Sequence, residues 1–156
     1  MCPKSAFLAA RCLDGRWAAT TRPADRGQAG RIGLPGGKVE AGEHPAAAAL
    51  REAAEEGWRI LRHVPDPQGR LDHPGRWVPI APSDLIPIHE QLVEGRPVVW
   101  YAPPPGCYAV RDLSGRHKEA GRVEPVRATS RQIRASGWGN DAALAAWHRL
   151  IGGRHG

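Results

Sequence analysis

Residues 36–58 read GGKVEAGEHPAAAALREAAEEGW, and this stretch carries the strongest structural signal in the chain. Residues 45–56 are rich in Ala, Leu, Arg and Glu, which are strong helix formers. Pro45 suits the first helical position, and Gly57 suits the end of a helix. The stretch therefore predicts a tight glycine turn followed by a helix over 45–56.

One face of this helix is acidic. Glu52, Glu55 and Glu56 are spaced i, i+3 and i+4, so they share a face. Such carboxylates repel one another, and a divalent cation can neutralise them. Because hard oxygen ligands favour magnesium or manganese, the cluster indicates a metal site. A merely acidic, solvated face is the alternative. The residues expected to pack against a sheet are Ala46, Ala47, Leu50, Ala53 and Ala54.

The turn before the helix is dominated by backbone. Leu34-Pro35-Gly36-Gly37 lets the chain approach a ligand closely, because glycine lacks a Cβ. Such a turn can present a carbonyl to a metal or amide groups to a phosphate. Glu43 lies near the helix start, where the helix dipole favours an anion. We expect Glu43 to reach Arg51 and to brace the loop against the helix.

The remaining elements are predicted from apolar runs and turn residues. Residues 13–15 read as the turn of a hairpin between the first two strands, and 22–30 as a loop. Asn140 or Asp141 is expected to cap a final amphipathic helix that runs through Leu150. The expected strands are 5–12, 16–21, 98–102, 107–113 and 122–128.

Residues 62–97 are rich in proline and are harder to interpret. Short apolar pieces at 77–80 and 85–88 fit edge strands or loop anchors, since proline is confined to such places. We expect a single domain over 1–156, in which 62–97 is a Pro-rich insertion. This insertion is expected to set substrate choice or the contacts of a homodimer, and not catalysis.

Composition limits the function classes. A chain of 156 residues with 41% hydrophobic and 24% charged residues suits one globular domain. The net charge of +6 favours anionic ligands, or simply solubilises the surface. Because the charge forms no polybasic run, nucleic acid is not the expected partner. No window reaches the length of a membrane span.

Cysteine use gives an expectation about location. Cys2, Cys12 and Cys107 are odd in number and have no CxxC spacing. They therefore fit reduced thiols in a cytoplasmic protein, and neither a disulfide framework nor a zinc site.

Together the turn and the helix resemble the Nudix box, G-x5-E-x7-R-E-u-x-E-E-x-G-u, where u is a bulky apolar residue. The terminal glycine departs from this pattern: either one residue is missing before Gly57, or Trp58 replaces the glycine. Position 53 holds Ala and not a bulky residue. The resemblance is strong over 5–61, weaker over 98–150 and absent over 62–97. The matching residues are Gly37, Glu43, Arg51, Glu52, Glu55 and Glu56.

The resemblance implies an α/β fold, the Nudix-type α/β/α sandwich with a mixed β-sheet. It also implies magnesium- or manganese-dependent hydrolysis of a phosphoanhydride bond in a nucleoside diphosphate linked to another group, such as a (deoxy)nucleoside triphosphate. Glu52, Glu55 and Glu56 would hold the metal and carry catalysis, with the Gly37 carbonyl as a further ligand. Arg51 and Glu43 would orient these ligands without binding the metal themselves. The candidates for phosphate contacts are Arg22, Arg31 and Lys38.

A second signal lies at His117-Lys118-Glu119-Ala120-Gly121. It resembles the Lys-Glu-Gly run of some Nudix pyrophosphohydrolases that act on nucleoside triphosphates. By this resemblance Glu119 is a supplementary metal ligand or general base; an ordinary surface turn is the alternative. Aromatic faces stack on nucleobases. The tryptophans considered for this role are Trp17, Trp77, Trp100, Trp138 and Trp147.

Two rival functions remain open. An enzyme of the same fold could act on a nucleotide sugar, a dinucleoside polyphosphate or a capped RNA end, because the substrate is chosen by loops outside the box. A non-enzymatic nucleotide-binding sensor is the other rival. Such a sensor would tolerate loss of carboxylates, and here all carboxylates of the box are present. The sequence therefore favours the enzyme.

Overall fold

The computed structural model describes residues 2–21, 31–115 and 123–152. Its central sheet has four strands, of which β1 and β8 are parallel while the other neighbours are antiparallel. Two three-stranded antiparallel sheets accompany it, in the orders β10-β2-β3 and β6-β5-β9. In spatial order, the central strands are β4 (Gly36–Lys38), β1 (Ser5–Leu8), β8 (Arg96–Ala102) and β7 (Ile86–Val93).

The two smaller sheets hold the remaining strands, and two 3-10 turns lie in the described part of the chain. The 3-10 turns are η1 (Pro82–Asp84) and η2 (Leu113–Gly115). The strands are β2 (Trp17–Thr21), β3 (Ile32–Gly33) and β10 (Pro125–Ala128) in one sheet, and β5 (Trp58–Val64), β6 (Arg76–Pro79) and β9 (Cys107–Arg111) in the other.

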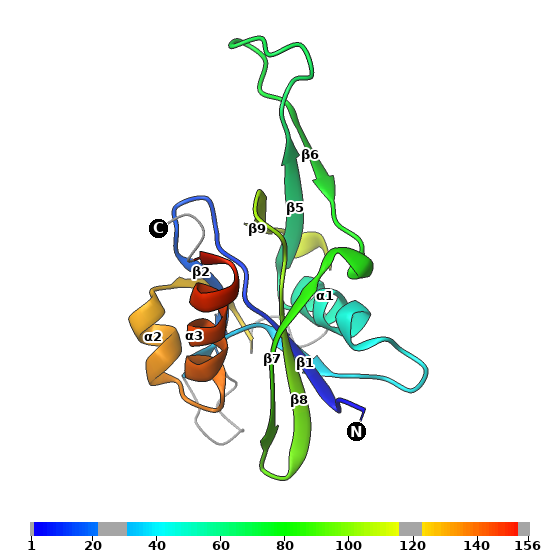
Figure 1. Cartoon of the computed structure of the whole chain (residues 1–156), viewed down its shortest axis with the longest axis vertical. Coiled ribbons are helices and arrows are strands. Elements are labelled where there is room, and N and C mark those ends of the chain that lie inside the picture. Colours follow the sequence, from blue (N-terminus) through cyan, green and yellow to red (C-terminus); the bar gives the residue numbers. More distant parts are fainter. Residues whose placement is uncertain (1, 22–30, 116–122, 153–156) are drawn as a thin grey trace.

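Helices cover both sides of the central sheet (Figure 1). Helix α1 (Pro45–Glu55) lies on one side, and α2 (Ser130–Ala135) with α3 (Asn140–Leu150) lies on the other. Successive side chains of β1 point to opposite faces of the sheet. Ala6 and Leu8 therefore join the core under α1, whereas Phe7 packs on the core under α3. The expected α/β/α sandwich with a mixed sheet is confirmed.

The buried face of α1 is wider than predicted. Ala46 and Ala53 are buried as expected, but Ala48 and Ala49 are buried as well. Ala47 and Ala54 are only half-buried. Contacts with β1, β4, β5 and η1 surround more of the helix than one sheet face would, which is the physical reason for the difference.

The predicted hairpin between the first two strands forms only in part. The amide of Ala18 donates to the Ala10 carbonyl at 2.9 Å, and that of Cys12 donates to the Arg16 carbonyl at 2.7 Å. Beyond this short ladder the strands diverge, because β1 pairs with β8 and β4 while β2 pairs with β10 and β3. The turn was therefore predicted correctly, but the strands enter different sheets.

The last helix begins differently from the prediction. Its N-cap is Gly139, in a left-handed conformation with φ of 88°, and neither Asn140 nor Asp141 caps it. The Asn140 side chain is buried, where its Oδ1 accepts from the Trp100 indole at 3.1 Å. A Cβ at position 139 would fall 2.5 Å from the Trp100 ring, so close packing selects glycine there.

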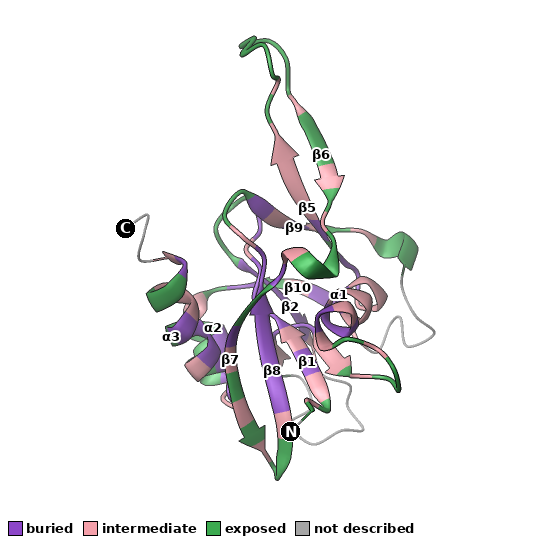
Figure 2. Cartoon of the chain, turned by 45° about the vertical axis from the view of Figure 1, so that its right-hand side comes forward, coloured by how far each residue is buried: buried purple, intermediate pink, exposed green. Residues whose placement is uncertain are grey.

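The proline-rich region 62–97 contains β6, η1 and β7 together with the end of β5 and the start of β8, and is not a long loop. The apolar pieces are indeed edge strands, since β6 and β7 each end their sheets. Strands β5 and β6 form a hairpin that projects from the body, and its tip is exposed (Figure 2). None of the described helices has the length and apolar character needed to cross a membrane.

Candidate active site

The glycine turn touches the acidic face of α1. Gly37 lies in β4, and a Cβ at this position would fall 2.5 Å from the Glu52 carboxyl carbon. A side chain at position 37 would displace the Glu52 carboxylate, so glycine lets the backbone of β4 and this carboxylate lie side by side. The structure thus brings the two ends of the motif into contact.

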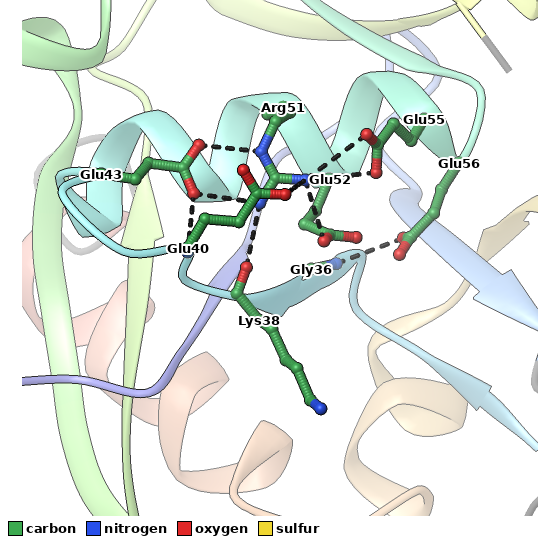
Figure 3. Close-up of polar contacts among 8 residues, drawn as sticks. All are labelled: Gly36, Lys38, Glu40, Glu43, Arg51, Glu52, Glu55 and Glu56. Carbon is green, nitrogen blue, oxygen red and sulfur yellow. Dashed lines mark hydrogen bonds and ion pairs between the residues drawn. The ribbon is translucent and has the colours of Figure 1, made fainter. Parts of the chain in front are cut away.

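Arg51 organises the carboxylates on this side of the helix (Figure 3). Its Nε and Nη2 atoms donate to the two Glu43 oxygens at 2.8 and 3.0 Å, the planar fork geometry that arginine favours. Its Nη1 donates to Glu52 at 3.1 Å and to Glu55 at 3.3 Å. The expected contact between Glu43 and Arg51 is therefore present, and the same arginine reaches two carboxylates of the acidic face.

Two further contacts fasten the loop before the helix. Arg51 Nη2 donates to the Lys38 carbonyl at 2.9 Å. Glu43 Oε1 accepts the amide of Glu40 at 3.0 Å, and the Glu40 carboxylate lies 3.8 Å from Arg51. Sequence reasoning missed these groups, because backbone donors and acceptors leave no residue-specific signal.

Glu56 reaches the turn from the end of the helix. Its Oε2 accepts from the Gly36 amide at 3.2 Å (Figure 3). Glu56 is the C-cap of α1, and Gly57 follows with φ of 95°. The early glycine therefore ends the helix directly after Glu56 and keeps its carboxylate at the site.

Trp58 has a structural role in the place where the motif normally has glycine. Its side chain is fully buried, and its indole donates to the Ala19 carbonyl at 2.8 Å. This bond ties β5 to β2 directly after the helix. The departure from the motif thus changes the packing after the helix and removes no carboxylate.

Burial and charge act in opposite directions on the carboxyl groups. Burial raises the pKa of Glu52, and the nearby Glu55 charge adds to this, while Arg51 opposes it. Arg51 instead holds the pKa of Glu43 below its usual value, with help from the Glu40 amide. The contacts with these acids raise the pKa of Arg51, so it stays charged. An added cation would therefore favour the charged form of Glu52.

The donor set fits a divalent cation. Glu52, Glu55 and Glu56 offer hard carboxylate oxygens, and the contact between Gly37 and Glu52 leaves no room for a competing side chain. Among the described residues, no three acidic, histidine or cysteine side chains already surround one point. The reason is that Glu55 points to Arg51 and Glu56 to the Gly36 amide. Holding an ion would require these two to turn from their present donors.

The residues expected to contact phosphate have different surroundings in the structure. Lys38 is exposed, and its ammonium points away from the carboxylates (Figure 3). Arg31 is also exposed, and its Nη1 donates to the Ser136 carbonyl at 3.4 Å, beside the C-cap of α2. Arg22 and Glu119 lie outside the described residues.

Comparison with known proteins agrees with this geometry. The family model described as NUDIX domain matches residues 5–106. An Escherichia coli (strain K12) protein named 8-oxo-dGTP diphosphatase is 27% identical over 103 residues, covering 47% of this chain and 80% of that protein.

Solved structures are similar in fold. A NUDIX hydrolase from Nitrosomonas europaea has a TM-score of 0.59 at 18% identity, covering 94% of this chain and 89% of that one. A structure described as an ADP compounds hydrolase has a TM-score of 0.63 at 15% identity, with 97% and 74% covered. A C. elegans Ap4A hydrolase has a TM-score of 0.52 at 16% identity, with 96% and 99% covered. With the family model spanning most of the chain and both halves of its motif meeting at Gly37 and Glu52, this chain belongs to the NUDIX domain family.

Proposed function

We propose that this Nudix pyrophosphohydrolase cleaves the phosphoanhydride bond of a (deoxy)nucleoside triphosphate, or of another nucleoside diphosphate linked to a small group, with magnesium as its cation. The observation that carries the proposal is the convergence of Glu52, Glu55 and Glu56 on the Gly36-Gly37 turn and on Arg51. The name of the Escherichia coli relative supports a triphosphate substrate. A sensor without activity would have no need to keep this set.

We assign different roles to the residues around this site. Glu52, Glu55 and Glu56 would hold the cation, with the Gly37 carbonyl as a further ligand, while Arg51 and Glu43 fix the helix against the loop. When bound, a divalent cation screens the substrate's charge and makes an attacking water more acidic. Arg22, Arg31 and Lys38 are our candidates for contacts with phosphate oxygens, and Arg31 and Lys38 are exposed.

The reaction is a direct displacement at phosphorus. Water oxygen forms a new bond to phosphorus, the bond to the bridging oxygen breaks, and the second phosphoryl group leaves. The proton of the water passes to a general base, for which Glu119 is our candidate. No Ser or Cys occurs within residues 36–58, so no covalent enzyme intermediate is expected.

The structure narrows the choice of a base-stacking tryptophan. Trp17, Trp58 and Trp100 are fully buried, and Trp77 lies on the projecting hairpin. Trp138 is half-buried and packs edge-on against Phe7, with ring centroids 5.0 Å apart. Phe7 pairs with Gly36 across β1 and β4, so this aromatic pair adjoins the glycine turn. We therefore infer that Trp138 contacts the nucleobase.

The β5–β6 hairpin is the proposed determinant of substrate choice or dimer contacts. It projects from the body, and Leu71 and Trp77 are exposed on it. Removing the tip, residues 66–74, should change the substrate preference or the oligomeric state measured by light scattering, while magnesium affinity stays the same. Loss of magnesium binding in a folded variant would place the hairpin at the site itself.

One experiment tests the main proposal. The purified chain is incubated with magnesium and a panel containing canonical and 8-oxo (deoxy)nucleoside triphosphates, a nucleotide sugar, a dinucleoside polyphosphate and capped RNA, in water enriched in heavy oxygen. Turnover should be highest on a triphosphate, and the label should enter a phosphoryl product. Preferred hydrolysis of another member selects a rival substrate, and absence of turnover on all of them supports the sensor. A trapped phosphoenzyme would contradict direct attack by water.

A further inference from the structure

A second cavity opens at the end of the central sheet, away from the acidic face of α1. Its volume is about 480 Å³, and none of its lining residues belongs to α1 or β4. Three segments bound it: the turn after β1, the β8–β9 connection and the end of α3. The described lining residues are Ala9–Leu13, Gly15, Pro103–Tyr108, Trp147, His148, Ile151 and Gly152.

The cavity lies on the α3 side of the molecule. Helices α1 and α3 pack on opposite sides of the central sheet (Figure 1). Trp147, His148 and Ile151 come from the last turns of α3 and its C-cap. A ligand in this cavity would therefore not occupy the carboxylate site.

Arg11 brings a positive charge to this cavity in an unusual setting. Its guanidinium lies against an edge-to-face pair of indole rings, 5.0 Å from the Trp17 centroid and 4.9 Å from that of Trp147. Its Nε is buried and meets no hydrogen-bond acceptor in the part of the chain that the structure describes. Arg11 thus carries its positive charge in a partly buried setting, and such a charge favours an anion beside it.

The nearby carboxylate is engaged elsewhere. Asp14 lies on the same turn as Arg11, but its Oδ2 pairs with Arg16 at 2.8 Å and with Arg127 at 3.5 Å. No aspartate or glutamate is among the described residues that line the cavity. Among the described residues that line the cavity, Arg11 therefore has no acidic counter-ion.

The rest of the wall is apolar and adds no compensating charge. Pro103, Pro104, Pro105 and Ile151 are among the apolar residues that line it. Burial lowers the pKa of His148, and the charges of Arg11 and Arg134 lower it further. His148 is therefore neutral at pH 7. It can donate a hydrogen bond, and it adds no second positive charge beside Arg11.

We propose that this cavity binds a small apolar carboxylate, whose carboxylate pairs with the Arg11 guanidinium and whose body lies between the prolines and Trp147. A planar carboxylate matches the planar donor fork of arginine. A cavity of about 480 Å³ suits a small organic molecule. A triphosphate is not expected there, because one arginine among apolar walls leaves most of its charge unmatched.

The test uses benzoate as the probe and benzamide as its neutral isostere. Both are titrated into the full chain without divalent cation, and the indole N–H and backbone amide signals are followed by NMR. Benzoate should bind with a dissociation constant in the millimolar range, on the order of 1 mM, and shift the Trp147 indole and residues 103–108. Benzamide should bind at least about tenfold more weakly, because it lacks the charge.

Variants locate the contact. Arg11→Met should weaken benzoate binding at least about tenfold, whereas Arg16→Met, on the same turn but outside the cavity, should leave it unchanged. Nucleotide hydrolysis should stay at the wild-type level in both variants, which also reports that they fold. Equal binding of benzoate and benzamide, equal binding to Arg11→Met, or shifts confined to Gly37 and Glu52 would each overturn the proposal. If Arg11→Met does not fold, the comparison of benzoate with benzamide on the wild-type chain decides.

Discussion

The Glu56 carboxylate accepts a hydrogen bond from the backbone amide of Gly36 at 3.2 Å, and this bond joins the end of α1 to β4. It shows that the shortened motif still delivers its last carboxylate to the glycine turn. Glu52 reaches the adjacent glycine, Gly37, from one helical turn earlier. The two carboxylates therefore approach the same two-residue stretch, and predictions about activity follow from this arrangement.

Each of Glu52→Gln, Glu55→Gln and Glu56→Gln should lower the maximal hydrolysis rate by about a hundredfold or more, because each removes one charge that holds the cation. Glu90→Gln is the matched control, since Glu90 is exposed on edge strand β7. Rates are measured with saturating magnesium, and circular dichroism confirms folding. A Glu56 variant with wild-type turnover would show that the shortened motif uses another ligand. Full activity in excess chelator would refute the dependence on a cation.

Trp138→Leu should raise KM for a nucleoside triphosphate several-fold while changing kcat little, because stacking on a base contributes binding in both ground and transition states. Trp147→Leu is the control, since Trp147 packs on Trp17 near the end of α3 and not beside the glycine turn. Both variants are compared by steady-state kinetics. Equal KM values for Trp138→Leu and the wild type would remove Trp138 from the base site.

The stability contributed by Glu43 should depend on pH. Arg51 and the Glu40 amide lower its pKa in the folded chain, so the folded state favours the charged form. This contribution is present above the pKa of Glu43 in the unfolded chain and is lost as the pH falls through its lower folded pKa. Without divalent cation, the urea midpoint of Glu43→Gln should lie below that of the wild type at pH 7, and the gap should narrow steadily as the pH is lowered into the acid range where Glu43 is protonated in the folded chain. A gap independent of pH would mean that Glu43 acts by packing and not by charge.

Gly57→Ala should destabilise the chain by more than about 1 kcal/mol, because residue 57 has φ of 95° and its new Cβ would lie 2.9 Å from Pro125 Cγ. Gly95→Ala separates the two causes, since Gly95 has φ of 79° but no atom near its Cβ position. Urea denaturation of both variants gives the difference. Equal losses would show that backbone strain alone selects glycine at position 57.

Glu119→Gln should lower kcat much more than it raises KM, because a general base acts on the attacking water and not on substrate binding. Glu119 lies outside the described residues, so the prediction rests on its place in His117-Lys118-Glu119. Glu124→Gln is the neighbouring comparison, since that carboxylate is the closest alternative in the sequence. Wild-type kcat in the Glu119 variant would assign the base to one of the helical glutamates.

The sequence by itself determined the helix and its chemistry. Residues 45–56 form a helix because their propensities and the flanking Pro45 and Gly57 act locally, and α1 indeed spans Pro45–Glu55. The spacing of Glu43 and Arg51 likewise predicted their contact, since both lie on one short segment whose geometry is nearly fixed. Local signals thus determined where the carboxylates lie along the chain.

Tertiary structure decided the contacts that link distant segments. The turn at 13–15 was predicted correctly, but β1 pairs with β8 and not with β2. The reason is that burial of Ala6 and Leu8 under α1 stabilises the chain more than a local hairpin would. Glycine is needed at position 139 because the Trp100 ring packs where a Cβ would lie. The Gly36 amide donates to the Glu56 carboxylate. Neither contact has a signal in the sequence. Arg11 is the clearest case, because it contacts the edge-to-face pair of Trp17 and Trp147 only where the end of α3 packs against β2. Such contacts depend on which apolar faces meet, and that is settled by the packing of the whole chain.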